Sequence, residues 1–280
     1  MKTSLTKTIL LDCLRRHQSG GIALAFSGGV DSTLLLALLR ELQQEQPFPW
    51  LALTMHSLFQ AESELTRVRE LARQWAVPLQ ILSLDPLRLE PVQNNRPDRC
   101  YWCKRQIFES FWAYARSQGL QTLMDGTNAD DLLAYRPGLR ALRELQVLSP
   151  LAELGIDKKT VRALARELGL ESAGKPSSPC LATRFEYGTA LTAGLLQQIQ
   201  KGEEILRRFC PEGTDLRLRR HGDLARIEVP PVLLPTLAGR HAELSAALKT
   251  LGFKYVTLDL EGFRSGSMDI TLSQKDPTEV

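Results

Sequence analysis

Residues 26–33, FSGGVDST, decide the predicted fold because they join a short apolar run to a long helical one. The run GIALAF at 21–26 is typical of a buried strand, and TLLLALLRELQQE at 33–45 lacks strand alternation and predicts a helix. Gly28 and Gly29 allow the backbone to turn sharply between the two. The segment therefore predicts a strand, a tight turn and a helix in direct succession.

The same turn has the composition of a phosphate-binding loop. Free N–H groups at a helix start, together with the hydroxyls of Ser27 and Ser32, can hold phosphate oxygens. The turn is not a Walker A loop, because no Gly-Lys-Ser/Thr follows it. The alternative interpretation is an ordinary Gly-Gly turn in which Asp31 or Ser32 caps the helix.

Apolar strands and helices alternate through the first half of the chain. Further strands are predicted at 50–55, 79–84 and within 121–128, and further helices at 61–77, 103–119 and 157–171. Fully apolar strands that alternate with helices indicate a parallel sheet covered on both faces. Such sheets bind ligands at the carboxyl ends of their strands. The predicted fold class is therefore α/β.

The pattern changes after about residue 188, which predicts a second, smaller domain. A helix at 192–209 is followed by an alternating hairpin that turns at Gly222-Asp223, a helix near 238–251 and a strand at 254–260. This order is typical of an α+β domain. We therefore expect domains at 1–188 and 189–280.

Composition limits the functional classes. The chain has 280 residues and a formal net charge of +3, which suits a phosphorylated ligand but does not indicate a nucleic-acid binder. Asp12, Arg15 and Arg16 interrupt the apolar patch near the N-terminus, so it reads as an amphipathic helix and not as a signal peptide. No run is long and apolar enough to span a membrane. We expect a cytoplasmic protein.

Three of the five cysteines call for a chemical explanation, because Cys13 and Cys210 fit buried, inert thiols. Cys100 and Cys103 form a C-x-x-C pair, which can belong to a zinc site, a redox dithiol or an iron–sulfur site. No second C-x-x-C or close His pair completes a zinc tetrahedron. With Cys180, three thiolates suit a [4Fe–4S] cluster whose open iron can hold sulfide. Alternatively, Cys100 and Cys103 lie near the site by chance.

Taken together with its flanking strand and helix, the turn resembles the PP-loop of the ATP pyrophosphatase family. The resemblance implies that ATP is cut between its α and β phosphates when an acceptor oxygen attacks the α-phosphate. It implies ATP contacts from Ser27, Gly28, Gly29, Val30, Asp31, Ser32, Gly126 and Thr127. Mg²⁺ would offset charge on the leaving pyrophosphate, with Asp31, Asp130 and Asp131 as candidate ligands. For Asp130 and Asp131 a solvated turn is equally compatible.

Two further segments narrow the resemblance. The PP-loop, PSSPCLATRFEYG at 176–188 and GFKYVTLDLEGFRSGSM at 252–268 together are similar to the LarE family of ATP-dependent sulfur transferases, over about residues 5 to 272. Such enzymes adenylate carboxylates of pyridinium-3,5-dicarboxylate mononucleotide and replace the activated oxygen with sulfur. The product becomes the nickel-pincer cofactor of lactate racemase. The resemblance implies catalytic roles for Cys180 and Asp31, and for Arg184 and Glu186 in orienting the substrate.

The source of the sulfur distinguishes two styles within that family. Members with one cysteine at the position of Cys180 give up its sulfur and keep dehydroalanine. Members that also carry C-x-x-C resemble cluster-binding, recycling enzymes. Because this chain has CYWC at 100–103, we expect a [4Fe–4S] cluster on Cys100, Cys103 and Cys180, with the sacrificial route still open.

Arginines on one alternating face of the predicted hairpin, Arg217, Arg219 and Arg226, are candidates to bind the substrate's phosphate, because guanidinium forks match phosphate oxygens. A charged edge strand is the alternative. Three other functions remain: a tRNA thiolase, an ammonia-using PP-loop synthetase, and a non-catalytic carrier. The sequence does not identify the sulfide donor, and the family suggests a homo-oligomer.

Overall fold

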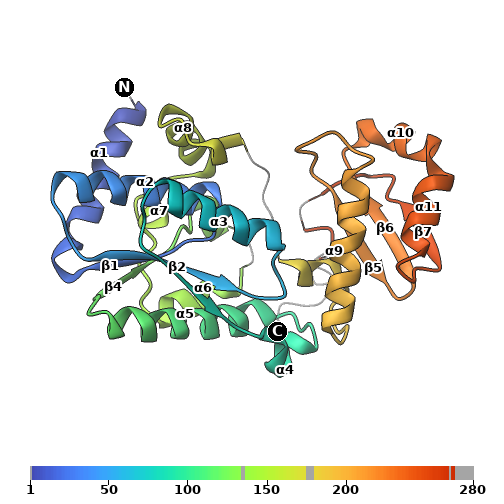
Figure 1. Cartoon of the computed structure of the whole chain (residues 1–280), viewed down its shortest axis with the longest axis horizontal. Helices are drawn as coiled ribbons and strands as arrows, with labels where there is room; N and C mark the ends of the chain where they lie inside the picture. The colour runs from blue at the N-terminus through green and yellow to red at the C-terminus, as the bar shows by residue number, and fades with distance from the viewer. Residues whose placement is uncertain (1, 134–135, 175–179, 265, 269–280) are drawn as a thin grey trace. The chain divides into compact units, whose positions relative to one another are not determined.

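The computed structural model describes residues 2–133, 136–174, 180–264 and 266–268 (Figure 1). Its contacts divide the chain into two compact units. The first unit comprises Met1–Pro86 and Cys100–Ser177, and the second comprises Leu87–Arg99 and Ser178–Val280. Residues 87–99 thus belong to the second unit by their contacts, and the domains expected at 1–188 and 189–280 stay a prediction.

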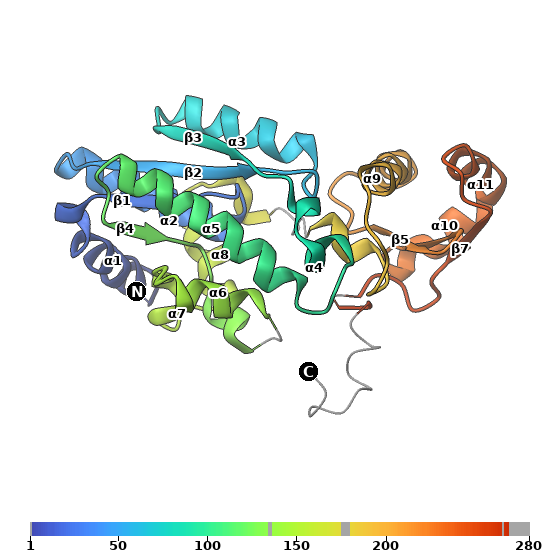
Figure 2. The same ribbon diagram turned by 90° about the horizontal axis from the view of Figure 1, so that it is seen from below.

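The first unit is built on a parallel four-stranded sheet with the order β3-β2-β1-β4 (Figure 2). The strands are β1 (Ile22–Ala25), β2 (Trp50–His56), β3 (Leu79–Ser83) and β4 (Thr122–Met124). β1 pairs in parallel with both β2 and β4, so it lies at the centre of the sheet. The predicted α/β class with a parallel sheet is confirmed.

Helices cover both faces of this sheet (Figure 1). The longer helices are α1 (Lys2–Arg15), α2 (Val30–Glu45), α3 (Glu62–Gln74), α5 (Arg99–Ser117) and α8 (Lys158–Glu167). Successive strand residues point to opposite faces. Accordingly Leu24 packs in a core with the leucines of α2, while Ala23 packs with Phe108 of α5. Both faces of the central strand β1 are buried, which explains why this strand is apolar throughout.

Short elements join these parts of the first unit. They are η1 (Gln18–Gly20), η3 (Ala129–Leu133), α6 (Gly138–Glu144), α7 (Pro150–Glu153) and η4 (Glu171–Gly174), and η2 (Pro86–Arg88) includes the point where the chain passes into the second unit. η3 follows β4 at the carboxyl edge of the sheet. None of the helices in the described ranges is long and apolar enough to cross a membrane.

The second unit holds a three-stranded sheet with the order β5-β6-β7. β5 (Arg217–His221) and β6 (Leu224–Glu228) form the predicted antiparallel hairpin, and β7 (Tyr255–Leu258) pairs in parallel with β6. The other elements are α4 (Glu90–Gln93), η5 (Leu181–Arg184), α9 (Ala193–Arg207), η6 (Pro231–Leu233), α10 (Leu234–Gly239) and α11 (His241–Lys249). The helix predicted near 238–251 corresponds to α11, and α10, which ends just before Arg240, was not predicted.

Helix α9 covers one face of the small sheet. Gly202 lies so close to the side chain of Leu218 that an added Cβ would collide with it. Because side chains alternate along a strand, Arg217 and Arg219 point to the face opposite Leu218. Arg226 is the register partner of Arg219 across the hairpin. The register therefore gathers three arginines on the face that α9 does not cover.

Candidate functional site

The turn between β1 and α2 is preformed. Gly28 has a φ of 74°, and an added Cβ there would lie 2.8 Å from Val68 Cγ2. The Ser27 and Ser32 hydroxyl oxygens are 3.2 Å apart, and Ser32 Oγ donates to the Gly29 carbonyl at 3.1 Å. The hydroxyl groups of Ser27 and Ser32 therefore lie side by side between the end of β1 and the first turn of α2, as in a phosphate-binding turn.

The loop after β4 is fixed against the first turn of α2. An added Cβ at Gly126 would lie 2.9 Å from the Ser32 backbone nitrogen. The buried carboxylate of Asp125 accepts hydrogen bonds from Thr127 Oγ1 at 2.5 Å and Ser149 Oγ at 2.6 Å. This close approach and these bonds hold the β4 loop and the PP-loop side by side.

The three carboxylates predicted to hold Mg²⁺ lie in one hydrogen-bonded group. Asp31 accepts from Asn128 Nδ2 at 3.1 Å and from Lys158 Nζ. Asp130 accepts from the Lys158 backbone nitrogen, and Asp131 accepts from the Asn128 backbone nitrogen, both at 3.0 Å. Lys158, the first residue of α8, therefore joins two of these acidic residues.

A cavity of about 350 Å³ opens at the carboxyl ends of β1, β2 and β4. Its polar wall contains six of the predicted ATP and Mg²⁺ residues: Ser27, Asp31, Ser32, Gly126, Thr127 and Asp131. Its apolar wall includes Met55, Ile107, Phe108 and Phe111. Asp130 is not among the described residues that line it. A polar turn opposite an apolar wall suits a nucleotide, whose phosphates and base have these two characters.

The C-x-x-C pair lies on the first turn of α5. Cys100 is exposed and Cys103 is half-buried, and residues three apart on a helix share a side. Between them Tyr101 is buried, and its hydroxyl donates to Glu144 Oε2 at 2.7 Å. An added Cβ at Gly138 would lie 3.3 Å from the Cys100 carbonyl oxygen. Helix α6 thus holds the turn that carries both thiols.

Cys180 lies in the second unit, where it is exposed and caps the start of η5. Arg184, at the end of this short helix, is only 2% exposed, and its Nε donates to Glu203 Oε1 at 2.7 Å. Thr183 N donates to the Cys180 carbonyl at 3.0 Å. The turn that carries Cys180 is therefore anchored to α9 by a buried ion pair.

The three cysteines of the predicted cluster thus come from both units, with Cys100 and Cys103 in the first and Cys180 in the second. Within the described ranges, no group of three or more His, Cys, Asp or Glu side chains lies together as metal ligands would. The chain passes between units at Arg99–Cys100 and at Ser177–Ser178. Each cysteine is therefore close in sequence to a crossing point, and the cluster stays a prediction.

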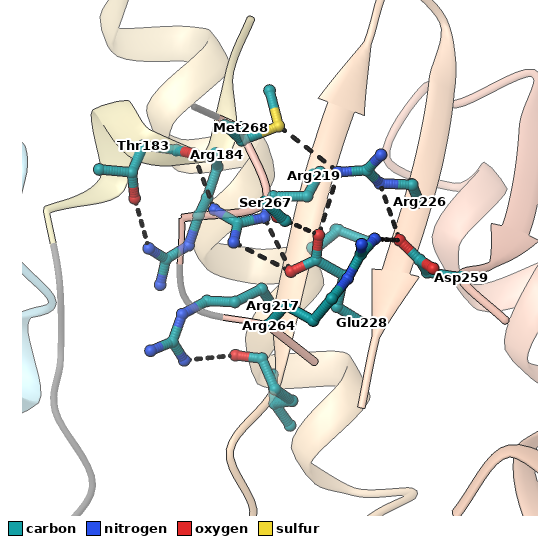
Figure 3. A network of polar contacts seen from close by, with 12 residues as sticks. Thr183, Arg184, Arg217, Arg219, Arg226, Glu228, Asp259, Arg264, Ser267 and Met268 are labelled. Carbon is teal, nitrogen blue, oxygen red and sulfur yellow. Dashed lines mark hydrogen bonds and ion pairs between the residues drawn. The ribbon is translucent and has the colours of Figure 1, made fainter. Parts of the chain in front are cut away.

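The three arginines predicted to bind phosphate lie in one polar network, in which Arg217 and Arg219 are buried and Arg226 is half-buried (Figure 3). Glu228, which is completely buried, accepts from Arg219 Nε and from Arg226 NH2, both at 3.0 Å. Arg219 also donates to the Thr183 carbonyl at 2.8 Å. The network therefore reaches the turn that carries Cys180.

Several arginines and carboxylates meet in this network. Among the described residues, the guanidinium groups of Arg184, Arg217, Arg219, Arg226 and Arg264 lie near the carboxylates of Glu203, Glu228 and Asp259, while Arg207 also pairs with Glu203 and Glu261 with Arg264. Burial, reinforced by the neighbouring Arg184, lowers the pKa of Arg217 to about 10. Burial also lowers the pKa of Arg219. A bound anion near these two groups would favour their charged forms.

Glu186, predicted to orient the substrate, is exposed and lies 2.8 Å from His221 Nδ1. The neighbouring backbone is fixed by Asn95, which is fully buried and has a φ of 47°. Asn95 Nδ2 donates to the Phe185 and Glu186 carbonyls at 3.3 and 2.8 Å. These hydrogen bonds tie the segment 87–99 to residues of the second unit, to which its contacts assign it.

Sequence reasoning missed several residues that shape these sites. For Lys158 the sequence offers only a weak indication, namely its position directly after Asp157, which caps the start of α8. Glu228 had a clearer one, because it follows Arg226 by two residues and so shares its face of the strand. Asn95 and Glu203 had none, since their partners are distant in sequence.

Comparisons with known proteins agree with this geometry. The PP-loop domain family matches residues 2–96. The chain is 36% identical, over 253 residues and 90% of each protein, to the pyridinium-3,5-bisthiocarboxylic acid mononucleotide synthase of Lactiplantibacillus plantarum. It is 33% identical to an uncharacterized protein of Methanocaldococcus jannaschii, covering 87% of this chain and 91% of that protein.

A more distant relative is aligned over a smaller part of its own length. The chain is 26% identical to the tRNA(Ile)-lysidine synthase of Pseudomonas aeruginosa, with 77% of this chain and 56% of that protein aligned. The two nearly full-length similarities and the preformed PP-loop agree with each other. The chain belongs to the LarE family of ATP-dependent sulfur transferases, within the PP-loop ATP pyrophosphatases.

Proposed function

We propose that this protein adenylates the carboxylates of pyridinium-3,5-dicarboxylate mononucleotide and converts them to thiocarboxylates for a nickel-pincer cofactor. The observation that carries the proposal is the 36% identity, across 90% of both chains, to a synthase of the corresponding bisthiocarboxylic acid. The PP-loop cavity supports the ATP half of the reaction, and the arginine network supports the binding of a phosphorylated substrate.

In the first step, a carboxylate oxygen of the substrate attacks the α-phosphorus of ATP. The bond from that phosphorus to the bridging oxygen breaks, which leaves an acyl adenylate and pyrophosphate. The turn at Ser27 and Ser32 would bind the phosphates of ATP. Asp31 and Asp131 offer carboxylate oxygens, which Mg²⁺ prefers, and the ion would offset charge on the leaving pyrophosphate.

In the second step, sulfur displaces AMP from the acyl adenylate. The substrate's phosphate would bind at Arg217, Arg219 and Arg226, because these guanidinium groups share one face of the hairpin and a bound anion would favour their charged forms. The hydrogen bond from Arg219 to the Thr183 carbonyl supports a carboxylate position near Cys180, three residues earlier in the chain. One site would then join phosphate recognition to sulfur transfer.

The donor set fits a cluster with one open iron. Cys100 and Cys103 share one side of α5, and Cys180 is exposed on η5. A [4Fe–4S] cluster held by these three thiolates would supply sulfide from its open iron. In the sacrificial alternative, Cys180 Sγ attacks the acyl adenylate, expels AMP and forms a thioester. Loss of the Cys180 α-proton and cleavage of its Cβ–S bond then leave dehydroalanine and the thiocarboxylate.

Pyrophosphate release tests the first half of the proposal. The anaerobically purified protein is mixed with ATP, Mg²⁺ and the dicarboxylate mononucleotide, and pyrophosphate and the product mass are measured. We expect release that depends on the mononucleotide, and a product in which sulfur replaces oxygen. Release that requires tRNA would favour the thiolase instead, and the similarity to a tRNA(Ile)-lysidine synthase makes tRNA a worthwhile added substrate. If no pyrophosphate is released with either substrate, a non-catalytic carrier becomes the favoured function.

Iron and acid-labile sulfide content test the sulfur source. The Cys103→Ser variant is compared with Cys210→Ser, because Cys210 is half-buried and burial raises the pKa of its thiol. We expect iron in the native protein and in the Cys210 control, and its loss in the Cys103 variant. If neither protein holds iron after reconstitution, the cluster is excluded. A mass loss of one H₂S at Cys180 after a single turnover would then identify the sacrificial route.

A further inference from the structure

Lys104 lies where the polar and apolar walls of the PP-loop cavity meet. It lines the cavity, and its Nζ is 3.9 Å from Asp125 Oδ2 and 5.7 Å from the ring centre of Phe108. Asp125 belongs to the loop that packs on the PP-loop, while Phe108 belongs to the apolar wall. In ATP the α-phosphate joins the nucleoside to the terminal phosphates. A cation at this junction is therefore placed for the α-phosphate.

The surroundings of Lys104 keep its ammonium group available to a ligand. A separation of 3.9 Å is too long for a hydrogen bond. Asp125 already accepts from Thr127 N, Thr127 Oγ1 and Ser149 Oγ, so its oxygens are satisfied without Lys104. Among the described residues that line the cavity, the second cation is Arg136, which forms an ion pair with Asp131 at 2.8 Å.

Helix α6 confines the stem of this lysine. An added Cβ at Gly138 would lie 2.9 Å from Lys104 Cδ and 3.2 Å from its Cγ. The absence of a side chain at Gly138 lets the aliphatic part of Lys104 lie against α6, and an added Cβ would displace it. Lys104 also directly follows Cys103 in the helix. The helix that carries the two thiols thus also carries the cation of the nucleotide cavity.

We propose that Lys104 binds a non-bridging oxygen of the ATP α-phosphate and stabilises the charge that develops there during adenylation, with Gly138 as its positioning residue. The inference rests on the proposed adenylation. As the acceptor oxygen bonds to the α-phosphorus and the pyrophosphate leaves, negative charge gathers on the α-phosphate oxygens. A fixed ammonium group beside them lowers the energy of this transition state more than that of bound ATP.

The test compares Lys104→Met with Lys104→Arg, and uses Lys7→Met as the matched control. Lys7 lies on α1, where its Nζ forms an ion pair with Glu41 of α2 at 2.8 Å, and it does not line the PP-loop cavity. ATP affinity is measured by calorimetry, and pyrophosphate release by rapid mixing with the dicarboxylate mononucleotide. We expect Lys104→Met to slow release by about 100-fold or more, with ATP affinity changed by less than about threefold. Lys104→Arg keeps the charge and retains most of the rate, and Lys7→Met matches the native protein.

Two further variants separate this role from a structural one. If Lys104 only neutralises Asp125, the double variant Lys104→Met/Asp125→Asn regains the native rate, and the proposal is overturned. We expect no such rescue. Gly138→Ala, which pushes on the lysine stem, should slow release by roughly tenfold at unchanged ATP affinity. A native rate in Lys104→Met also overturns the proposal, whereas absence of release from the native protein would instead refute the proposed adenylation.

Discussion

The PP-loop cavity and the arginine network are built by opposite means. The cavity depends on the backbone: Gly28 turns in the left-handed region, and Gly126 brings two loops within contact. The network depends on side chains, because buried arginines are held by buried carboxylates such as Glu228. A site formed by the backbone should be sensitive to an added methyl group, whereas a site formed by buried charges should be sensitive to the loss of one charge.

The largest expected effect comes from removing the charge of Glu228. Glu228→Gln keeps the side-chain shape but leaves the buried Arg219 and the half-buried Arg226 beside a neutral amide. We expect the free energy of unfolding to fall by roughly 3–5 kcal/mol, measured by urea denaturation. Glu243→Gln removes one partner of an exposed Arg–Glu pair and should change stability little. Equal effects of the two substitutions would refute the idea that burial makes the network fragile.

Arg217 should matter for substrate binding more than for stability. Its guanidinium lies 4.9 Å from the ring centre of Phe263, on the face of β5 opposite its strand neighbour Arg220. We expect Arg217→Met to weaken mononucleotide binding by about 1.5–3 kcal/mol, the typical value of a charged hydrogen bond, with ATP binding unchanged. Calorimetry with each ligand measures both. A comparable loss in Arg220→Met would argue against a phosphate site on this face.

A single methyl group should disturb the cavity. In Gly126→Ala the new Cβ would lie 2.9 Å from the Ser32 backbone nitrogen, so the β4 loop must move away from α2. We expect ATP affinity to fall by roughly 1–3 kcal/mol, the usual cost of overpacking, as measured by isothermal titration. Gly194→Ala, whose Cβ would have its nearest neighbour at 3.9 Å, serves as the control. An unchanged ATP affinity in Gly126→Ala would show that the two loops need not touch.

The smallest expected loss of stability comes from removing the cap of α9, the helix that carries Glu203. Thr192 caps α9, and its side chain accepts from the Leu195 backbone nitrogen at 3.3 Å. We expect Thr192→Ala to lower stability by about 1 kcal/mol and Thr192→Ser to leave it nearly unchanged, as measured by thermal unfolding. If the serine variant loses as much as the alanine variant, the cap contributes nothing.

The sequence predicted the cavity better than the network for a physical reason. The strand, the PP-loop turn and the helix are neighbours in the chain, so apolar runs and glycines at 21–45 carry their signal locally. Arg217, Arg219 and Arg226 could be placed on one face because strand alternation is also local. Their carboxylate partners could not all be found this way, because Glu203 comes from a helix whose packing on β5 leaves no sequence pattern.

The association of residues 87–99 with the second unit was equally hidden. It depends on Asn95, whose bonds to the Phe185 and Glu186 carbonyls span about ninety residues of chain. A buried asparagine with positive φ looks, in sequence, like any loop residue. Lys104 carries no sequence signal of its own, because its relation to Asp125 exists only once β4 and α5 have packed together.

The long reach of Asn95 has a consequence for synthesis on the ribosome. Residues 87–99 leave the ribosome well before their partners at 185–191, to which Asn95 and Gln93 are bonded. At elongation rates of about 5–20 residues per second, this delay amounts to roughly 5–18 seconds. For most of this delay, Cys100 and Cys103 have left the ribosome and Cys180 has not. Any three-thiolate site must therefore be completed late, after the first unit has had time to fold.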